Sequence, residues 1–559
     1  MRSIAAHPSS PKFKYKKLQE VSEQEEMGNK SVSRTSLESA ANNDDEERLK
    51  KLGYEQNLPR QFSLFQTFGL VLTNCSVIIG ILSCIHVDFL GVVPLFSVAM
   101  QVGGPMTFVW GWVLTSVFTC MTALCLSEIV SAYPTAGGLY YYSAKLSSGH
   151  SFGPLAAFTT AWLNALGQIA GTAGSVYAGA TFFNITLYLI SSRTWDWIVT
   201  DERWVFTTFL VMMVLGGVAN SFGGSPLKMS AFISVMIHTV GIFVLLLVLL
   251  IVAPVKQSPS YVLTTFRDET GWTSMINAPP IFVFALGLLP SAWSQIGFDS
   301  SAHLSEETHS AHLNGPRAIM LTVGSAIVTG LALILCFLFC IQNLEGQELE
   351  MAQFANHLPV QIVYDAGGPI LAILFSIFVA LAGFLCGVGT IAANSRMLYA
   401  FARDGGLPFS DTLVVLNEKT KMPTRLVWVS VLASVILIVP SLFSSTVLNA
   451  VSGLSIIGFT SSYAIPIFLR ITVGQETFEQ AEFNLGKWST LVGSLSIAWI
   501  AFLFIVFQFP NAAPAFPVTL ANFNFVPAVL FLLVIFIGSW WMLDARYWFK
   551  GPQVQFSGE

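Results

Sequence analysis

Twelve segments of this chain are apolar, poor in charge and long enough to cross a lipid bilayer as helices. A spanning helix needs about 20 residues, because the hydrocarbon core is about 30 Å thick and a helix rises about 1.5 Å per residue. In lipid, only helices and closed barrels satisfy their own backbone polar groups. The sequence therefore predicts an all-α polytopic membrane protein with twelve transmembrane helices, over residues 65–84, 106–132, 154–190, 204–220, 229–252, 281–297, 318–341, 369–394, 426–442, 447–469, 491–507 and 526–543.

The composition agrees with this fold class. Of the 559 residues, 53% are hydrophobic and 11% are charged, and the mean hydropathy is +0.65. Soluble domains carry roughly 25% charged residues. These values exclude a chain of one or two soluble domains, and the formal net charge of −5 gives no indication of a nucleic-acid partner.

The basic residues predict the orientation, because cytoplasmic loops are enriched in Lys and Arg. If both termini are cytoplasmic, the opposite side holds only four of the 27 basic residues, namely Arg193, Arg203, Lys256 and Arg267. The remaining 23 then lie on the cytoplasmic side. We therefore expect both termini in the cytoplasm.

The first 61 residues are rich in Ser, Glu, Lys and Asn and have few aromatic residues. Such a segment cannot bury enough apolar surface to fold alone, so we expect a disordered cytosolic tail. Charged and polar residues occupy the place of the apolar core of a secretory signal, which leaves the first spanning helix as the insertion signal. A second short cytosolic tail is expected over residues 549–559.

Two of the twelve predicted helices are interrupted by polar and helix-breaking residues. The sixth contains Gly287, Pro290, Ser291, Ser294, Gln295 and Gly297, and the first contains Asn74, Ser76 and Gly80. Irregular backbone at membrane depth is tolerated only where it lines a cavity or is buried in protein. Interrupted helices in corresponding places of two halves indicate an inverted-repeat transporter with its binding site between the breaks.

This pattern divides the chain into two repeats of five helices. The first repeat is expected over residues 62–253 and the second over residues 254–470. Helices 11 and 12, over residues 471–548, lie outside the repeats.

Only two ionisable residues, Glu128 and His238, fall inside the predicted spans. Glu128 lies near the cytoplasmic end of helix two, where it can hydrogen-bond to a neighbouring helix or take part in gating or proton handling. His238 lies in the middle of helix five and has no nearby water-facing end. An imidazole changes charge within the physiological range, so His238 is either a proton carrier or a neutral, hydrogen-bonded core residue.

An unwound helix offers free N–H groups to an anion and free C=O groups to a cation, which suits a zwitterion. The sequence indicates no buried Arg, Lys or Asp near either break, and this predicts recognition by backbone rather than by side-chain charge. Trp293, beside the second break, either covers the ligand or packs in the core. Asn164 and Gln168 share one face of helix three and either hydrogen-bond between helices or line the pathway.

Neither the cysteines nor the histidines predict a metal site. The seven cysteines all lie in apolar segments without metal-ligand spacing, which favours packing roles. His303, His309 and His312 lie in a predicted cytosolic loop without a closed set of ligands. We expect no metal and no cofactor.

Several long motifs resemble those of a known group of proteins. They are GGPMTFVWGWVLTSVF and LSEIVSAYPTAGGLYYYSAKL in and after helix two, GLLPSAWSQIGFDSSAHLSEET around helix six, IAANSRMLYAFARDGGLPFS after helix eight, and DARYWFKGP after helix twelve. Over residues 58–552 the chain resembles the amino acid/choline transporter branch of the amino acid–polyamine–organocation superfamily. That branch includes fungal GABA and choline permeases and plant bidirectional amino acid transporters.

The resemblance implies the five-plus-five inverted repeat with two extra helices, discontinuous helices one and six, and alternating access. It also implies that the unwound parts of these two helices hold the substrate. The corresponding residues here are Ser76, Val77, Ile78, Ile79 and Gly80 in helix one, and Trp293, Ser294, Gln295, Ile296 and Gly297 in helix six, with Trp293 at the aromatic gate position.

The chain departs from the family pattern at two places. Family members often have Gly, Ser or Thr at the helix-one break, where this chain has Val77, Ile78 and Ile79, so the resemblance does not fix the size of the pocket. Some bacterial relatives place a Lys in helix five that substitutes for a sodium ion, and His238 falls near that position. Proton coupling through His238 is therefore a hypothesis.

Taken together, these features predict a secondary active transporter of GABA or another small amino acid, driven by the proton gradient, in the plasma membrane or alternatively in the vacuolar membrane. Uniport and exchange stay open, as do two alternatives. One is transport of choline, ethanolamine or thiamine-like amines, and the other is a nutrient sensor that signals through its tail. An enzyme is disfavoured, because the sequence shows no Ser-His-Asp set, metal cluster or phosphate-binding loop.

Overall fold

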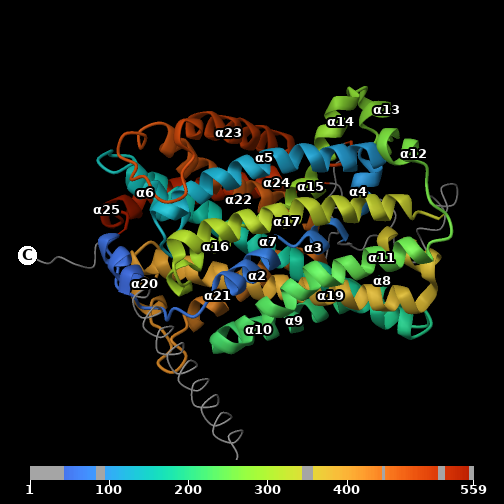
Figure 1. The fold of residues 1–559 in the computed structure, drawn as a ribbon, viewed down its shortest axis with the longest axis horizontal. Helices are drawn as coiled ribbons and strands as arrows, with labels where there is room; N and C mark the ends of the chain where they lie inside the picture. Colours follow the sequence, from blue (N-terminus) through green and yellow to red (C-terminus); the bar gives the residue numbers. More distant parts are fainter. Residues whose placement is uncertain (1–42, 83–94, 343–356, 443–446, 514–522, 553–559) are drawn as a thin grey trace, which may run out of the picture.

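The structure is a computed structural model that describes residues 43–82, 95–342, 357–442, 447–513 and 523–552. Its helices form one elongated bundle, with most of the long helices running along the same direction (Figure 1). In these ranges, eleven helical spans are long and apolar enough to cross a membrane, and one shorter apolar segment, Pro280–Trp293, accompanies them. The twelve predicted spans are thus all present as helices, the sixth broken into several short pieces.

The first five spans contain two interruptions. Span one is α2 (Leu64–Asn74) and α3 (Val77–Leu82), and span five is α10 (Gly224–Met236), the π-helix η1 (Ile237–Gly241) and α11 (Ile242–Val252). Both interruptions fall at residues that the sequence singles out, Ser76 and His238. The uninterrupted spans two to four are α5 (Gly104–Ala132), α7 (Gly153–Ile190) and α9 (Glu202–Phe222).

In the second half, span six is the most fragmented. It consists of α14 (Pro280–Leu286), α15 (Leu289–Trp293), α16 (Ser300–His303) and the 3₁₀ turn η2 (Ser305–Glu307). The other spans are α17 (Ala311–Phe339), α19 (Leu358–Arg403), α21 (Thr424–Ile438) with η4 (Val439–Leu442), α22 (Val447–Ile471), α23 (Ser489–Val506) and α24 (Phe525–Trp540).

Short helices connect the spans at the two ends of the bundle. They are α4 (Leu95–Gln101), α6 (Leu139–Leu146), α8 (Trp197–Thr200), α12 (Pro259–Thr264), α13 (Trp272–Ile276), α20 (Ser410–Leu413), η5 (Gly486–Trp488), η6 (Trp541–Ala545) and α25 (Arg546–Trp548). We call the end with α6, α20 and α25, at the left in Figure 1, the α6 end, and the end with α8, α12 and α13 the α12 end.

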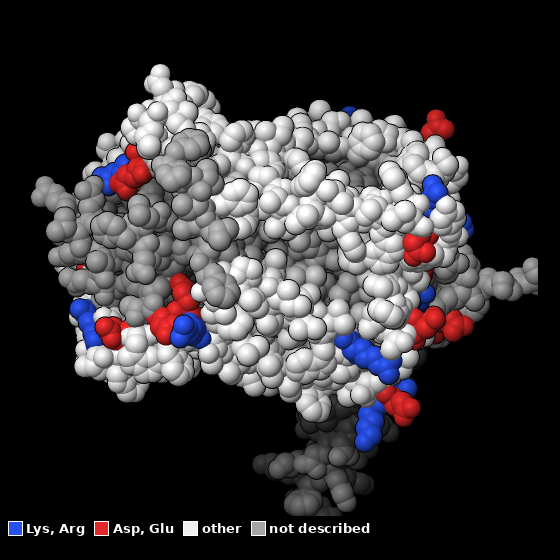
Figure 2. Space-filling view, turned by 180° about the vertical axis from the view of Figure 1, so that it is seen from behind, with Lys and Arg blue, Asp and Glu red and all other residues white. Residues whose placement is uncertain are grey.

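The lateral surface of the bundle is apolar. Figure 2 shows charged residues gathered toward the two ends of the face in view, with an uncharged belt between them. The exposed residues of the bundle include large apolar ones such as Val211 and Ile251. Such side chains are unfavourable in contact with water and favourable in contact with lipid. The described part of the chain therefore has the surface of an integral membrane protein.

Helix α7 lies at the centre of the bundle and packs along α19 and α22. Two pairs of glycines allow this close approach. A Cβ on Gly179 would lie 3.1 Å from the Cα of Gly383, and a Cβ on Gly458 would lie 2.6 Å from the backbone nitrogen of Gly167. Small residues at helix contacts are the common means of packing helices in membranes.

Residues 43–61, which the composition places in a disordered tail, are folded onto the α6 end. A helix covers residues 43–51, and Leu49, Tyr54 and Leu58 are buried. Two backbone N–H groups, those of Gln61 and Phe62, donate to the carbonyl of Glu307 at 2.8 Å. A segment too polar to fold alone is ordered here because a preformed surface supplies its partners. Residues 1–42 and 553–559 of the predicted tails lie outside the described residues.

Candidate functional site

The first break separates α2 from α3. Cys75 has φ −87° and ψ 51°, outside the helical region, and α3 starts two residues later. The N–H of Gly80 donates to the carbonyl of Ser76 at 2.8 Å. The first N–H groups of a new helix have no intrahelical acceptor, so this break brings unpaired backbone donors to the middle of the bundle.

The second break is longer. After Trp293 the backbone leaves the helix and does not resume it until Ser300, and Gly297 has a positive φ of 86° that glycine adopts at little cost. The two breaks touch through glycines. A Cβ on Gly80 would lie 2.2 Å from Ser294 Oγ, and a Cβ on Gly297 would lie 3.2 Å from the carbonyl oxygen of Asn74.

A pocket lies between the two breaks and three neighbouring helices. It is lined by Asn74, Ser76, Ile79, Gly80, Gly171, Ser175, Trp293, Ile296, Cys386, Thr390, Ser455 and Phe459. Its cavity is about 20 Å³, enough for about one water molecule. An amino acid would fit only after the lining side chains or helices move apart.

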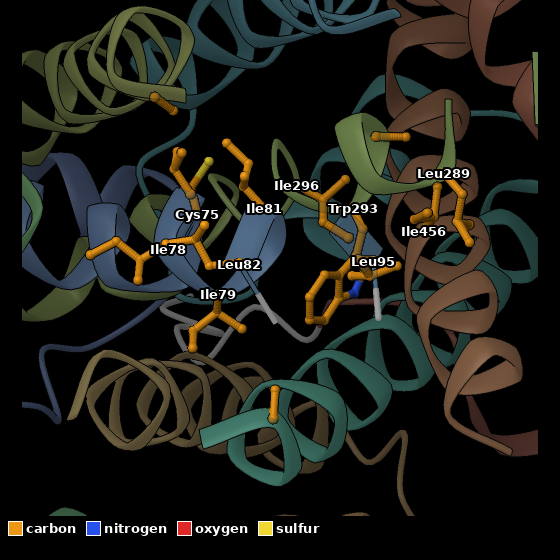
Figure 3. Packing of buried hydrophobic residues seen from close by; sticks show 14 of the residues in the cluster. Cys75, Ile78, Ile79, Ile81, Leu82, Leu95, Leu289, Trp293, Ile296 and Ile456 are labelled. Atoms are coloured by element: carbon orange, nitrogen blue, oxygen red, sulfur yellow. The ribbon is translucent and has the colours of Figure 1, made fainter. Parts of the chain in front are cut away.

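Five of the ten predicted contact residues line this pocket: Ser76, Ile79, Gly80, Trp293 and Ile296. In Figure 3, Ile79 of α3 and Trp293 of α15 extend to the same side of the broken helices. The other five, Val77, Ile78, Ser294, Gln295 and Gly297, are buried next to the breaks but do not line it. Their contact with a substrate stays a prediction.

The sequence analysis missed six lining residues on intact helices. Each of three helices contributes two residues four positions apart: Gly171 and Ser175 on α7, Cys386 and Thr390 on α19, and Ser455 and Phe459 on α22. Residues at this spacing share one helix face. Helix faces made of small and polar residues can be recognised in the sequence, but only the arrangement of the helices shows which of these faces meet.

His238 is buried in the π-helix of span five and contacts the first break directly. Its Nε2 accepts from the Ser76 hydroxyl at 2.9 Å, and its Nδ1–H donates to the carbonyl of Ser234 at 3.0 Å. A π-helical turn within an α-helix is frequently found at functional sites. His238 is therefore hydrogen-bonded at both nitrogens, and one of them is joined to a residue of the pocket wall.

Glu128 is far from the pocket, near the α6 end of α5. Its carboxylate accepts from the Ser489 hydroxyl at 2.7 Å and the Leu485 N–H at 3.1 Å, and it lies 3.4 Å from the Arg470 guanidinium. This is the hydrogen-bonded arrangement that we expected as one of two possibilities. A role of Glu128 in gating stays a prediction.

The expectation that no buried Asp lies near either break is wrong. Asp299 follows Gly297 by two residues, and its side chain is fully buried. It accepts hydrogen bonds from the Tyr463 hydroxyl at 2.7 Å, the Asn164 amide at 2.8 Å and the Gln168 amide at 3.4 Å. The predicted interhelical hydrogen bonding of Asn164 and Gln168 is thus confirmed, with a carboxylate as their shared acceptor.

The sequence predicted that the histidines after the second break lie in a loop, but His303 and His312 lie in helices. His303 lies in α16 with its Nε2 3.3 Å from Asp299 Oδ2, and His312 lies in α17, 3.7 Å from Asp45. Among the described residues, no group of three or more His, Cys, Asp or Glu is arranged to hold a metal ion.

Two buried ion pairs join the second break to α19 at the α6 end. Glu306 receives two hydrogen bonds from Arg403, at 2.9 and 3.1 Å, and Glu307 lies 2.7 Å from Arg396 Nε. Arg60, in the segment that precedes α2, donates to the carbonyl groups of Ser305 and Thr308. Buried charges are found in proteins when they are paired, as here. These contacts join the second break to α19 and to the segment before α2 at the α6 end.

Comparisons with known proteins identify the family. The family model described as amino acid permease matches residues 62–536. The chain is 32% identical to amino-acid permease BAT1 of Arabidopsis thaliana over 516 residues, which cover 90% of this chain and 95% of the relative. It is 26% identical to the GABA-specific permease of Saccharomyces cerevisiae, covering 94% of this chain and 88% of that protein, and 26% identical to amino-acid permease 2 of Neurospora crassa, covering 90% and 88%. The chain therefore belongs to the amino acid permease family and is an integral membrane transporter, not an enzyme.

Proposed function

We propose that this permease moves a small amino acid, with GABA as the first candidate, across the plasma membrane by proton-coupled alternating access. The observation that carries the proposal is the small polar pocket where the two broken helices meet. It lies where an inverted-repeat transporter binds its substrate, at the interface of the discontinuous helices. The names of two relatives, an amino-acid permease and a GABA-specific permease, agree with this substrate class.

The pocket wall favours a ligand without net charge. None of its described lining residues is Lys, Arg, Asp or Glu. The hydroxyl groups of Thr390 and Ser455 donate to backbone carbonyls and keep their lone pairs for an ammonium group. The Oδ1 atom of Asn74 is buried and has no hydrogen-bond partner in the described part of the chain, which makes it a further acceptor for an ammonium.

The Ser76 hydroxyl, which now donates to His238, and Ile79 of α3 lie on the same wall. Ile79 is in the first turn of α3, where N–H groups have no intrahelical acceptor, so these two residues can provide donors for a carboxylate. Ammonium and carboxylate are the two groups that every small amino acid carries. A neutral wall with both donors and acceptors therefore supports a zwitterionic substrate.

The closed pocket supports alternating access. A cavity of about 20 Å³ cannot hold an amino acid, and the ion pairs of Glu306 and Glu307 close the α6 end. The excess of Lys and Arg on this side supports a cytoplasmic α6 end with both termini in the cytoplasm. On this assignment the structure corresponds to a state that is closed toward the cytoplasm.

Proton coupling supplies sufficient free energy for accumulation. A proton crossing a membrane potential of 100 mV releases about 2.3 kcal/mol, whereas each tenfold accumulation of substrate costs about 1.4 kcal/mol. His238 supports a link between proton and substrate, because protonation of its Nε2 would turn the Ser76 hydroxyl from a donor into an acceptor. That change would alter the hydrogen bonding of the Ser76 hydroxyl in the pocket wall.

Amine transport is the second candidate, and two aromatic residues favour it. Trp293 and Phe459 both line the pocket, and quaternary ammonium groups bind to aromatic faces. Choline has no carboxylate, so it would leave the donors on Ser76 and α3 unused. We therefore rank it below an amino acid.

Uptake of radiolabelled substrates tests the proposal. Transport-deficient cells that express this chain would be given GABA, a mixture of neutral amino acids, or choline, with and without a protonophore. We expect saturable amino acid uptake that the protonophore abolishes. Trp293→Ala should reduce this uptake at least fivefold, whereas the matched variant Trp488→Ala, at a residue that is 57% exposed, should not. Uptake of choline alone, or substrate binding without flux, would contradict the proposal and favour an amine transporter or a sensor.

A further inference from the structure

The carboxyl group of Asp299 is surrounded by three hydrogen-bond donors from two helices. Its Oδ1 accepts from Tyr463 of α22, and its Oδ2 accepts from Asn164 and Gln168 of α7. These donors therefore provide a partner for each carboxyl oxygen of Asp299, although water has no access to it.

His303 faces this carboxylate with one nitrogen and a carbonyl group with the other. Its Nδ1 lies 3.2 Å from the carbonyl oxygen of Ala136, and its Nε2 lies 3.3 Å from Asp299 Oδ2. A carbonyl oxygen can only accept, so Nδ1 carries a hydrogen. If the ring were neutral, Nε2 would present a lone pair to a carboxylate oxygen, and two buried acceptors would face each other. One additional proton must therefore lie between Nε2 and Oδ2.

The remaining charged groups around this pair are already neutralised. Glu306 of η2 accepts from the Ala136 N–H but is paired with Arg403 of α19. The other ionisable groups on the elements packed around the pair are Tyr463 on α22, Tyr142 on α6, Glu307 of η2 paired with Arg396 of α19, and His312 of α17 paired with Asp45. Burial raises the pKa of Tyr142, so this residue stays neutral. Loss of the shared proton would leave one uncompensated carboxylate in a closed site, which costs several kcal/mol.

We propose that Asp299 and His303 hold between them the proton that moves with the substrate. The proton leaves to water on the α6 side only when α16 separates from the turn at Ala136, because the deprotonated pair is stable only when hydrated. This inference rests on the proposed proton-coupled transport and assigns a place to the coupling proton.

The pair is connected to the pocket through one tyrosine. The Tyr463 hydroxyl that donates to Asp299 also accepts from the N–H of Gly297, at 3.2 Å. Gly297 in turn lies against the carbonyl of Asn74, which is part of the pocket wall. A change in the charge of Asp299 therefore reaches both breaks through a short chain of contacts.

The test uses the purified full-length chain in proteoliposomes that contain a pH-sensitive dye. Two quantities are measured with radiolabelled GABA, or with the amino acid that the uptake screen identifies. They are substrate counterflow at equal pH on both sides, which needs no net proton movement, and substrate-driven proton entry. The variants are Asp299→Asn and His303→Gln. Their matched controls are Asp411→Asn and His150→Gln, at exposed residues.

We expect both pair variants to retain counterflow within threefold of the wild type and to lose at least tenfold in substrate-driven proton entry, with both controls unchanged. Proton entry at the wild-type rate in Asp299→Asn would overturn the assignment.

If the variants do not fold, the wild type alone decides, because one proton should enter per substrate between pH 6 and 8. A ratio of protons to substrate near zero would overturn the inference. Counterflow without proton entry in the wild type would contradict the proton site but leave amino acid transport standing, whereas absence of counterflow for every substrate would contradict the proposed function itself.

Discussion

The two breaks in the membrane helices differ in their electrostatics. At the first break, the hydrogen-bond partners of His238 in the described part of the chain are the neutral residues Ser76 and Ser234. At the second, Asp299 and His303 are buried with His303 Nε2 3.3 Å from Asp299 Oδ2, and the Glu306 and Glu307 ion pairs lie a few residues further along. A buried charge requires a partner or a hydration shell. The first break is therefore suited to recognising a neutral zwitterion, and the second to changing its charge as the bundle opens.

The two breaks also differ in what holds them. The first is packed against its neighbours by apolar contacts and a few hydroxyl groups. The second is fastened by ion pairs to α19, by backbone hydrogen bonds to Gln61 and Phe62, and by hydrogen bonds from the Arg60 side chain. Ion pairs and hydrogen bonds can be exchanged for hydrogen bonds to water, whereas apolar packing cannot. We therefore expect the second break to move more than the first during transport.

The largest expected effect concerns the ion pairs of the second break. Glu307→Gln leaves the fully buried Arg396 without a charged partner, and such a change costs about 3–5 kcal/mol in the free energy of unfolding. Glu269→Gln is the control, because its partner Arg267 is partly exposed and such pairs contribute about 0–1 kcal/mol. Thermal unfolding of the purified protein measures both. Equal melting temperatures for the two variants would show that the charges of the second break are not what holds it.

The next prediction concerns the contact between the breaks. Gly80→Ala places a Cβ 2.2 Å from Ser294 Oγ, closer than real atoms approach, so the two broken helices must move apart. We expect substrate uptake to fall at least tenfold at equal surface expression. Gly324→Ala, on α17 where a Cβ meets nothing within 4 Å, should transport like the wild type. Undiminished uptake by Gly80→Ala would mean that the breaks do not act as one site.

Much of this fold could be predicted from the sequence, because apolar length determines spanning helices. The main difference in length is in α19, which begins at Leu358 whereas the sequence suggested residue 369. Gly368 is non-helical, with φ 76° and ψ −174°, and Pro369 follows it. A Gly-Pro pair is an ordinary helix boundary, but here the chain resumes helical structure on both sides of the kink.

The candidate site was less predictable, and Asp299 shows why. Composition and the length of an apolar segment place the end of span six at Gly297, so Asp299 falls outside the predicted span. The structure turns α16 back into the bundle, where Tyr463 and Asn164 reach the carboxylate. Those two residues lie 164 and 135 positions away along the chain. Sequence patterns report local periodicity, and only the tertiary arrangement reports such contacts.

A smaller effect is expected from His238. His238→Gln removes the ring that accepts from Ser76 but leaves a neutral side chain that can hydrogen-bond. We expect the KM for substrate to rise about three- to tenfold, which corresponds to the loss of roughly one hydrogen bond, and to become less dependent on pH. Proton entry should persist, because our proposal places the coupling proton at the second break. If the KM of His238→Gln kept the pH dependence of the wild type, His238 would not link the proton to the substrate.

The smallest effect concerns the N-terminal segment, which fastens the α6 end next to the second break. The buried Tyr54 hydroxyl donates to Asp404 at 2.7 Å, and this hydrogen bond joins the N-terminal segment to the bundle. A hydrogen bond to a charged group contributes about 1.5–3 kcal/mol. Burial, and then the negative charge of Asp404, raise the pKa of Tyr54 well above 10. Its contribution is therefore complete below about pH 10 and declines as the pH rises toward and through the raised pKa.

Tyr54→Phe should lower the melting temperature at pH 8 by a few degrees. Between pH 8 and pH 11 the wild type should lose more stability than Tyr54→Phe, because only the wild type has this hydroxyl to ionise. Tyr547→Phe, at a residue that is 65% exposed, is the control and should follow the wild type at both pH values. Identical pH dependence in the wild type and Tyr54→Phe would show that the segment is held by its apolar residues alone. The second break would then be restrained by its own ion pairs, and opening of the α6 end would not require release of the N-terminal segment.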